Sequence, residues 1–190
     1  MGMLDAQLQF SAAQTITASA QSTNFYDALT GSLLTTTYTP TPTGTLFPVN
    51  QTYFQEDLGI GKGPGTPRVV VETGTVFATL TSLQIQFQGA PENSTSHTSG
   101  NRSDLVFVTY IQSDTIGLAL LTANTRIFAF DWPMRKVAAT WGNVPRFYQL
   151  NYVVGGSNAT TGTINADVTL GDDDAQTTLP QFGSNYKVAA

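Results

Sequence analysis

Short runs in which apolar and polar residues alternate constrain this chain more than any other feature. Near its start, Leu4, Ala6, Leu8 and Phe10 occupy every second position, a spacing that puts their side chains on one face of a β-strand. Alternating or continuous apolar runs predict further strands at residues 16–20, 69–71, 76–80, 83–87, 105–112, 115–121, 126–132, 147–154 and 163–170. Since no stretch repeats its apolar residues at helical period over helical length, we expect single helical turns at most, at 119–123 and 135–140.

The predicted strands are short, and clusters of Gly, Pro, Asn and Asp separate them. About eight to ten such strands with turn signals between them are typical of a β-sandwich or a barrel. The length of 190 residues predicts one domain, which would bury roughly 70% of the surface that the unfolded chain exposes. Such a core needs no disulfide, so the absence of cysteine does not weaken the fold.

Few side chains in this sequence can perform chemistry. There is no cysteine and a single histidine, and charged residues amount to 11%, compared with roughly a quarter in an ordinary soluble domain. A chain this poor in acids, bases and nucleophiles fits a structural or binding protein better than an enzyme. We expect no catalytic residue, no cofactor and no metal.

Charge and hydropathy argue against two classes of partner. The net charge is −5 and the basic residues are scattered, whereas nucleic-acid binding draws its affinity from clustered Lys and Arg. No apolar run approaches the roughly 18–20 residues of a membrane-spanning helix. The first residues also lack the basic and apolar regions of a secretory signal. We therefore expect neither a nucleic acid nor a membrane as partner.

Three segments lack a strand pattern. Residues 31–57 are rich in Thr and Pro and contain Phe47, Tyr53 and Phe54, residues 89–104 are a Ser, Thr, Asn and Gly loop, and residues 171–190 form an acidic and then polar tail. Loops as long as the first are usually functional or disordered. We interpret residues 31–57 as an extended loop or arm inserted into a single domain that spans residues 1–190.

The motifs that suggest catalysis or phosphate binding have simpler explanations. His97 lies in a polar loop, and no Gly-x-Ser-x-Gly elbow occurs in the chain, so we interpret it as a solvated histidine. The glycine-rich residues 59–65 lack the helix start of a phosphate-binding loop, because Gly63 and Pro64 follow Lys62 and Pro67 blocks a helix. We interpret them as a turn before a strand.

Carboxylates and aromatic side chains supply the remaining candidates. The run of three aspartates that begins at Asp172 lacks the spacing of a calcium loop, so we expect a solvated acidic turn. A glycosidase would need a pair of carboxylates, which this chain could draw from Glu56, Asp57, Asp131 and Asp167. The aromatic residues in or beside strands belong mostly in the core, while an exposed subset would suit sugar stacking or a protein interface: Trp132, Trp141, Tyr148 and Tyr152.

Three segments carry a family resemblance through their sequences and their order. The first is LDAQLQFSAAQ at 4–14, continuing through Ser22-Thr23-Asn24 to Asp27; the second is DLGIGK at 57–62; the third is RFYQLNYVVGG at 146–156, followed by the strand 162–170. Together they cover less than a third of the chain. In this respect the sequence resembles the jelly-roll capsid cement (decoration) proteins of tailed bacteriophages.

The resemblance implies a jelly-roll β-sandwich that forms a homodimer or another homo-oligomer. It also implies a place on the outer capsid surface of the virion, where the protein would stabilise the shell by bridging subunits of the major capsid protein. Residues 28–56 look like an insertion into the family pattern. We expect 31–56 to be a clamping arm over a neighbouring subunit, with Phe47, Tyr53 and Phe54 as anchors, because buried aromatic side chains commonly dominate interface energies.

Two other functions stay open, because a fold does not decide function. The first is a carbohydrate- or receptor-binding jelly-roll module of a phage particle, which requires exposed tryptophan or tyrosine beside amide side chains, with Trp132 and Trp141 as candidates. The second is a glycoside hydrolase of sandwich fold, which requires an essential Asp or Glu.

Overall fold

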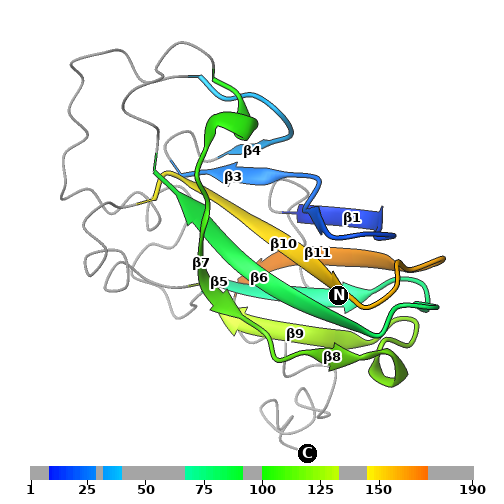
Figure 1. Ribbon diagram of the computed structural model, residues 1–190. Helices are drawn as coiled ribbons and strands as arrows, with labels where there is room; N and C mark the ends of the chain where they lie inside the picture. The colour runs from blue at the N-terminus through cyan, green and yellow to red at the C-terminus, as the bar shows by residue number, and fades with distance from the viewer. Residues whose placement is uncertain (1–8, 29–31, 40–66, 92–99, 133–144, 171–190) are drawn as a thin grey trace, which may run out of the picture.

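The computed structural model describes residues 9–28, 32–39, 67–91, 100–132 and 145–170. Within these residues the chain is all-β, as the sequence predicts: the strands form two antiparallel sheets, connected by turns and two single-turn 3₁₀ helices, η2 (Arg102–Asp104) and η3 (Leu118–Leu120). Figure 1 shows the sheets lying one against the other as a β-sandwich.

The smaller sheet has the strand order β1 (Gln9–Thr15), β11 (Thr163–Leu170), β5 (Pro67–Thr73) and β9 (Arg126–Asp131). The larger sheet has the order β4 (Ser32–Leu34), β3 (Phe25–Asp27), β10 (Phe147–Gly155), β6 (Ser82–Ala90) and β7 (Val108–Gln112). Two further strands extend the larger sheet, because β2 (Ala20–Gln21) pairs with β10 and β8 (Ile116–Gly117) pairs with β6.

The core between the sheets follows from the period-two pattern. In β6, Leu83, Ile85 and Phe87 are fully buried, and the glutamines between them point to the outer face. An aromatic cluster occupies the middle of the core, where the ring of Trp132 lies 5.0 Å from that of Phe87 and 5.3 Å from that of Tyr148. Burying large aromatic side chains in this way supplies much of the driving force for folding.

The predicted strand at 76–80 is wrong. Ala78 makes an isolated bridge to Thr161, Thr79 has a positive φ of 72°, and Val76 is 54% exposed. The buried residues of this turn are Phe77 and Leu80. The apolar alternation here is therefore incidental, because the side chains that reach the core are three residues apart.

Three other predicted strands are shorter than expected. The strand expected at 105–112 is limited to Val108–Gln112, since the chain follows η2 without strand pairing up to residue 107. In 16–20, Ile16 is buried in the core but the strand is limited to Ala20–Gln21, because the backbone of Thr17 pairs with Ala159 instead. In 115–121, the strand ends at Gly117 and the chain continues into η3. The strands expected at 83–87, 126–132, 147–154 and 163–170 are all present.

The beginning of the predicted arm is part of the sandwich. Residues 32–34 form β4, which pairs with β3, and Tyr38 is 6% exposed and donates a backbone hydrogen bond to Gly100. The three predicted anchor residues of the arm, Phe47, Tyr53 and Phe54, lie outside the described residues. The same holds for these other features named from the sequence: Glu56, Asp57, 59–65, His97, Trp141 and 171–190.

Candidate functional site

One end of the sandwich carries the strand ends from which the chain leaves the described residues. There β3 and β6 end and β10 begins, and Trp132, just after β9, packs against Tyr148 near the start of β10. Pro67 and Leu170 are register partners at the same end of the smaller sheet. We call this end the loop end (Figure 1). Since binding residues of β-sandwiches commonly lie on loops held by a rigid frame, it is the first candidate site.

A buried ion pair fixes the loop end. Arg146 donates from Nε to Asp27 Oδ1 at 2.8 Å and from Nη2 to Asp27 Oδ2 at 2.7 Å, and the two side chains are 7% and 1% exposed. Arg146 Nη2 also donates to the carbonyl of Thr39 at 2.9 Å. The backbone of Arg146 pairs with Ala28 and Ala90. Through its side chain and its backbone, Arg146 therefore holds together the ends of β3 and β6 and the segment after β4.

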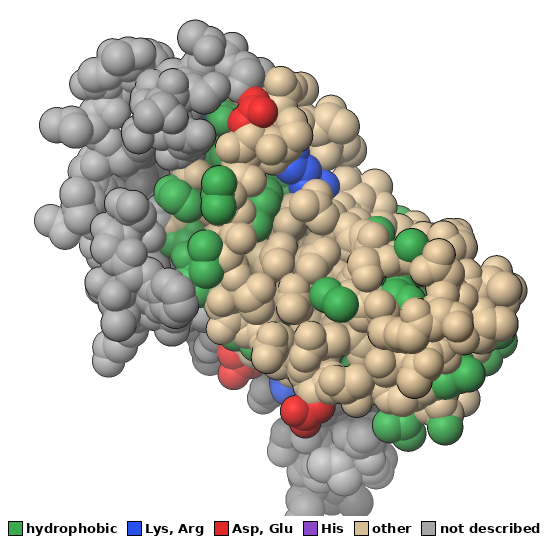
Figure 2. Space-filling view, in the orientation of Figure 1, with side chains coloured by type: hydrophobic (Ala, Val, Ile, Leu, Met, Phe, Trp, Pro, Cys, Tyr) green, Lys and Arg blue, Asp and Glu red, His purple; other side chains and the backbone are tan. Residues whose placement is uncertain are grey.

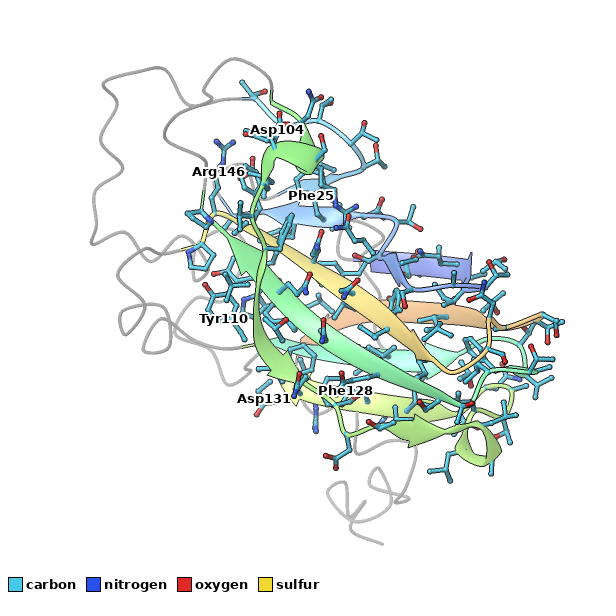
Figure 3. All side chains as sticks on the ribbon, in the orientation of Figure 1. Phe25, Asp104, Tyr110, Phe128, Asp131 and Arg146 are labelled. Atoms are coloured by element: carbon cyan, nitrogen blue, oxygen red, sulfur yellow. The ribbon has the colours of Figure 1, made fainter. Side chains whose placement is uncertain are left out.

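A small aromatic cluster surrounds this pair on the outer face of the larger sheet. The guanidinium of Arg146 lies 4.6 Å from the ring centroid of Phe147 and 5.4 Å from that of Tyr38. Phe25 and Leu105 complete the cluster, with Ala90 beneath. Figure 3 shows Arg146 and Phe25 on this side of the loop end. Packing and hydrogen bonds thus hold the described strand ends together at the loop end.

Beyond the cluster, the outer face of the larger sheet is covered by uncharged amides. We call this surface the amide face, and it consists of Gln84, Gln86 and Gln88 on β6 with Gln149 and Asn151 on β10. Gln149 is fully buried and the other four side chains are half-buried, so these four form the accessible part of the face. Register pairs set Gln149 opposite Gln88 and Asn151 opposite Gln86. In Figure 2 this face is turned to the viewer and is mostly tan, with acidic and basic side chains towards its borders.

Arg102 of η2 borders the amide face. Its Nε and Nη2 donate to Gln149 Oε1 at 2.9 and 2.7 Å, and its Nη1 donates to the carbonyl of Ser22 at 2.9 Å. The guanidinium also lies 5.1 Å from the ring centroid of Phe25. Burial lowers the pKa of Arg102 to about 10, so the group remains a cation at neutral pH.

The outer face of the smaller sheet has the opposite character, because it carries ion pairs. Arg68 lies 3.8 Å from Asp131, and Arg126 lies 3.7 Å from Glu72. Burial raises the pKa of Asp167 between these pairs, a hydrogen bond from Gln9 opposes the shift, and the charge of Glu72 adds to it. Half-exposed pairs at these distances contribute little to stability.

The catalytic candidates gain no support from this geometry. Asp131 is engaged by Arg68, and Asp167 lies opposite Val70 in the sheet. The part of the chain that the structure describes holds no cluster of three His, Cys, Asp or Glu side chains that could bind a metal ion. Its helices, a single turn each, are also too short to cross a membrane.

Trp132 is not available for sugar stacking. It is 3% exposed, and Tyr148 and Tyr152 are also buried, which confirms the prediction that most of these aromatics belong to the core. In the described ranges, every aromatic side chain is buried or half-buried. The expectation of an exposed tryptophan beside amides is therefore wrong for Trp132.

Sequence reasoning missed the roles of Arg102 and Arg146. Both are among only eight basic residues in the chain, and Arg146 directly precedes a strongly alternating strand. The available signal was a rare basic residue, Arg146, directly before Phe147 and close to Gln149 in the sequence.

No protein-family model and no curated protein sequence matches this chain.

Proposed function

We propose that this protein is a virion structural protein that binds the outer surface of a capsid and stabilises the shell by bridging subunits of the major capsid protein. The observation that carries the proposal is the combination of a loop end held by the Asp27–Arg146 pair with a sheet face of uncharged amides. Interfaces are depleted of charged residues at their centres, and the amide face has that composition.

The strand order supports a jelly-roll form of the sandwich. The order β1-β11-β5-β9 in one sheet faces β3-β10-β6-β7 in the other, so the first long strand lies beside the last. Along the chain, β1, β5, β9 and β11 belong to the smaller sheet, and the strands between them belong to the larger sheet. Double Greek-key sandwiches of this kind occur in viral capsid and lectin domains, so the fold is compatible with the proposal and does not by itself establish it.

The proposed contact is the segment that joins Thr39 to Pro67. Both of these residues lie at the loop end, where the Asp27–Arg146 pair holds the departing chain. Phe47, Tyr53 and Phe54 fall within this segment and are the proposed anchors in a neighbouring capsid subunit.

Capsid binding by a triple variant tests the proposal. The deletion of residues 31–56 would also remove β4 and Tyr38, so F47A/Y53A/F54A is the sharper change. Co-sedimentation with capsids that lack the protein should show saturable binding of the wild type and loss of binding by the variant. The matched control is L118A/L120A, which truncates exposed apolar residues beside the start of β6, far from the loop end. Equal binding by both variants and the wild type would reject the arm.

The alternative is a carbohydrate- or receptor-binding module of a phage particle. With Trp132 in the core, Trp141 is the remaining tryptophan for sugar stacking. Binding to a glycan array that disappears in W141A, without binding to capsids, would favour this alternative. A glycoside hydrolase would instead reveal itself by activity that a single Asp or Glu substitution abolishes.

A further inference from the structure

The amides of the larger sheet form one directed chain of hydrogen bonds. Gln149 Nε2 donates to Gln88 Oε1 at 2.8 Å, and Gln88 Nε2 donates to Gln86 Oε1 and to Thr109 Oγ1, both at 3.2 Å. Asn151 Nδ2 donates to the same Gln86 oxygen at 2.9 Å. The chain crosses β10, β6 and β7, so it spans the sheet rather than following one strand.

Arg102 determines the direction of this chain. An amide side chain can present either its oxygen or its nitrogen to a neighbour, but Arg102 is donor-only and occupies the Gln149 oxygen with two hydrogen bonds. The Gln149 nitrogen must then face Gln88, which in turn directs the Gln88 nitrogen towards Gln86. Because neighbouring hydrogen bonds polarise one another, a cation at one end strengthens the whole series.

At the end of the hydrogen-bond chain opposite Arg102, a row of amide side chains runs across the sheet, carries no charge and reaches solvent. Register pairs align Gln112, Gln86, Asn151 and Gln21 across four strands, and Gln112 and Gln21 are exposed. A partner with fixed charge would find no counter-charge in this row. An apolar partner would strip the amides of water without replacing their hydrogen bonds, which costs free energy. The surface therefore fits a partner that is uncharged and supplies both donors and acceptors.

We propose that the amide face is a second docking surface, which binds an uncharged hydrogen-bonding surface of a neighbouring major capsid protein subunit. Arg102 is its positioning residue. This inference rests on the proposed function, in which a chain that bridges two subunits by itself uses two separate contact surfaces. The loop end provides the first, and the amide face lies on the side of the sandwich rather than at its end (Figures 1 and 2). The neutrality of the face selects the partner: among the described residues, the outer face of the smaller sheet carries two ion pairs, whereas charged side chains such as Arg102 lie at the border of the amide face.

The test is a pair of isosteric substitutions that each add one negative charge. Q86E keeps the oxygen that accepts from Gln88 and Asn151, so the fold should survive, but it places a charge at the centre of the proposed contact. We expect affinity for capsids lacking the protein to fall by about tenfold or more. N165D, on β11 of the smaller sheet, makes the same chemical change outside the contact, where Asn165 Oδ1 accepts from the backbone of Ala13. It should bind within about twofold of the wild type.

A second variant tests the positioning role of Arg102. In R102M the Gln149 oxygen loses its donor, so the side-chain amide NMR signals of Gln149, Gln88 and Gln86 should shift together and capsid binding should weaken. R102K keeps a cation and should restore part of both. A purely structural role would lower thermal stability without moving the distant Gln86 signal, and this result would overturn the positioning role.

The outcomes separate the two proposals. Wild-type binding that Q86E leaves unchanged overturns the amide face and leaves the proposed function standing. Failure of the wild type to bind capsids overturns both. If Q86E changes the oligomeric state, measured by sedimentation in solution, the partner of the amide face is a second copy of this chain. If Q86E instead abolishes binding of a glycan, the partner is a sugar. Either result overturns the assignment to the capsid protein.

Discussion

The side chains of Arg146 and Asp27, which are 119 residues apart in sequence, meet through two hydrogen bonds of 2.8 and 2.7 Å at the loop end. Each lies within a few residues of a point where the chain leaves the described sandwich. Arg146 also donates to the carbonyl of Thr39, the last described residue before the proposed arm. The pair therefore couples the stability of the sandwich to the position at which the arm begins.

Removing one member of this pair should strongly lower the free energy of unfolding. D27A leaves the buried Arg146 guanidinium without its carboxylate, and losing one partner of a buried ion pair typically costs about 3–5 kcal/mol. Urea unfolding followed by circular dichroism measures the change. The control is D131A, which removes the partner of Arg68 in a pair whose side chains are 31% and 70% exposed; its cost should stay below about 1 kcal/mol. Equal effects of the two substitutions would contradict the anchoring role.

Trp132 should behave as a core residue and not as a ligand-binding residue. W132A removes a ring that stacks on Phe10, meets Phe87 edge to face and lies tilted against Tyr148, and such substitutions cost about 3–5 kcal/mol. Thermal unfolding should show a large decrease in melting temperature. A variant with wild-type stability that had lost binding to a glycan would show that the core assignment is wrong.

The stability of the protein should depend on pH through Asp167. Burial raises the pKa of this carboxyl in the folded state, so the unfolded state releases its proton first as the pH rises. The carboxyl therefore favours folding most at pH below its unfolded pKa of about 3.9, and this contribution is lost as the pH rises through the folded value.

The matching substitution is D167N, which removes the ionisation. Its free energy of unfolding should exceed that of the wild type at pH 7, and the difference should shrink as the pH falls towards about 4. D114N, at an exposed turn position, should change stability by less than about 0.5 kcal/mol at either pH. A constant difference between D167N and wild type across this range would contradict the assignment.

The strands were predictable where a period-two pattern coincided with strong boundaries. The strand at 163–170 was predicted to the residue, because its alternation begins after Gly162 and ends before Gly171. The pattern at 76–80 failed because Phe77 and Leu80, rather than Val76 and Ala78, reach the core of a turn. Alternation alone cannot distinguish a strand from a turn that buries two residues.

The candidate surfaces were much less predictable. In the sequence, Asp27 and Arg146 are single charged residues 119 positions apart, and no neighbouring residue indicates that the fold brings them together. The glutamines of β6 were predictable as the polar side of a strand, but their link to Arg102 depends on the register between β6 and β10 and on the place of η2. Long-range register is a property of the folded chain, which explains why the amide face emerged only from the structure.

The abundance of this protein in purified virus particles, measured relative to the major capsid protein, tests the central claim most directly. The proposal predicts a ratio of one copy per capsid subunit or another simple icosahedral fraction. A few copies per particle, or none, would contradict a role in reinforcing the shell.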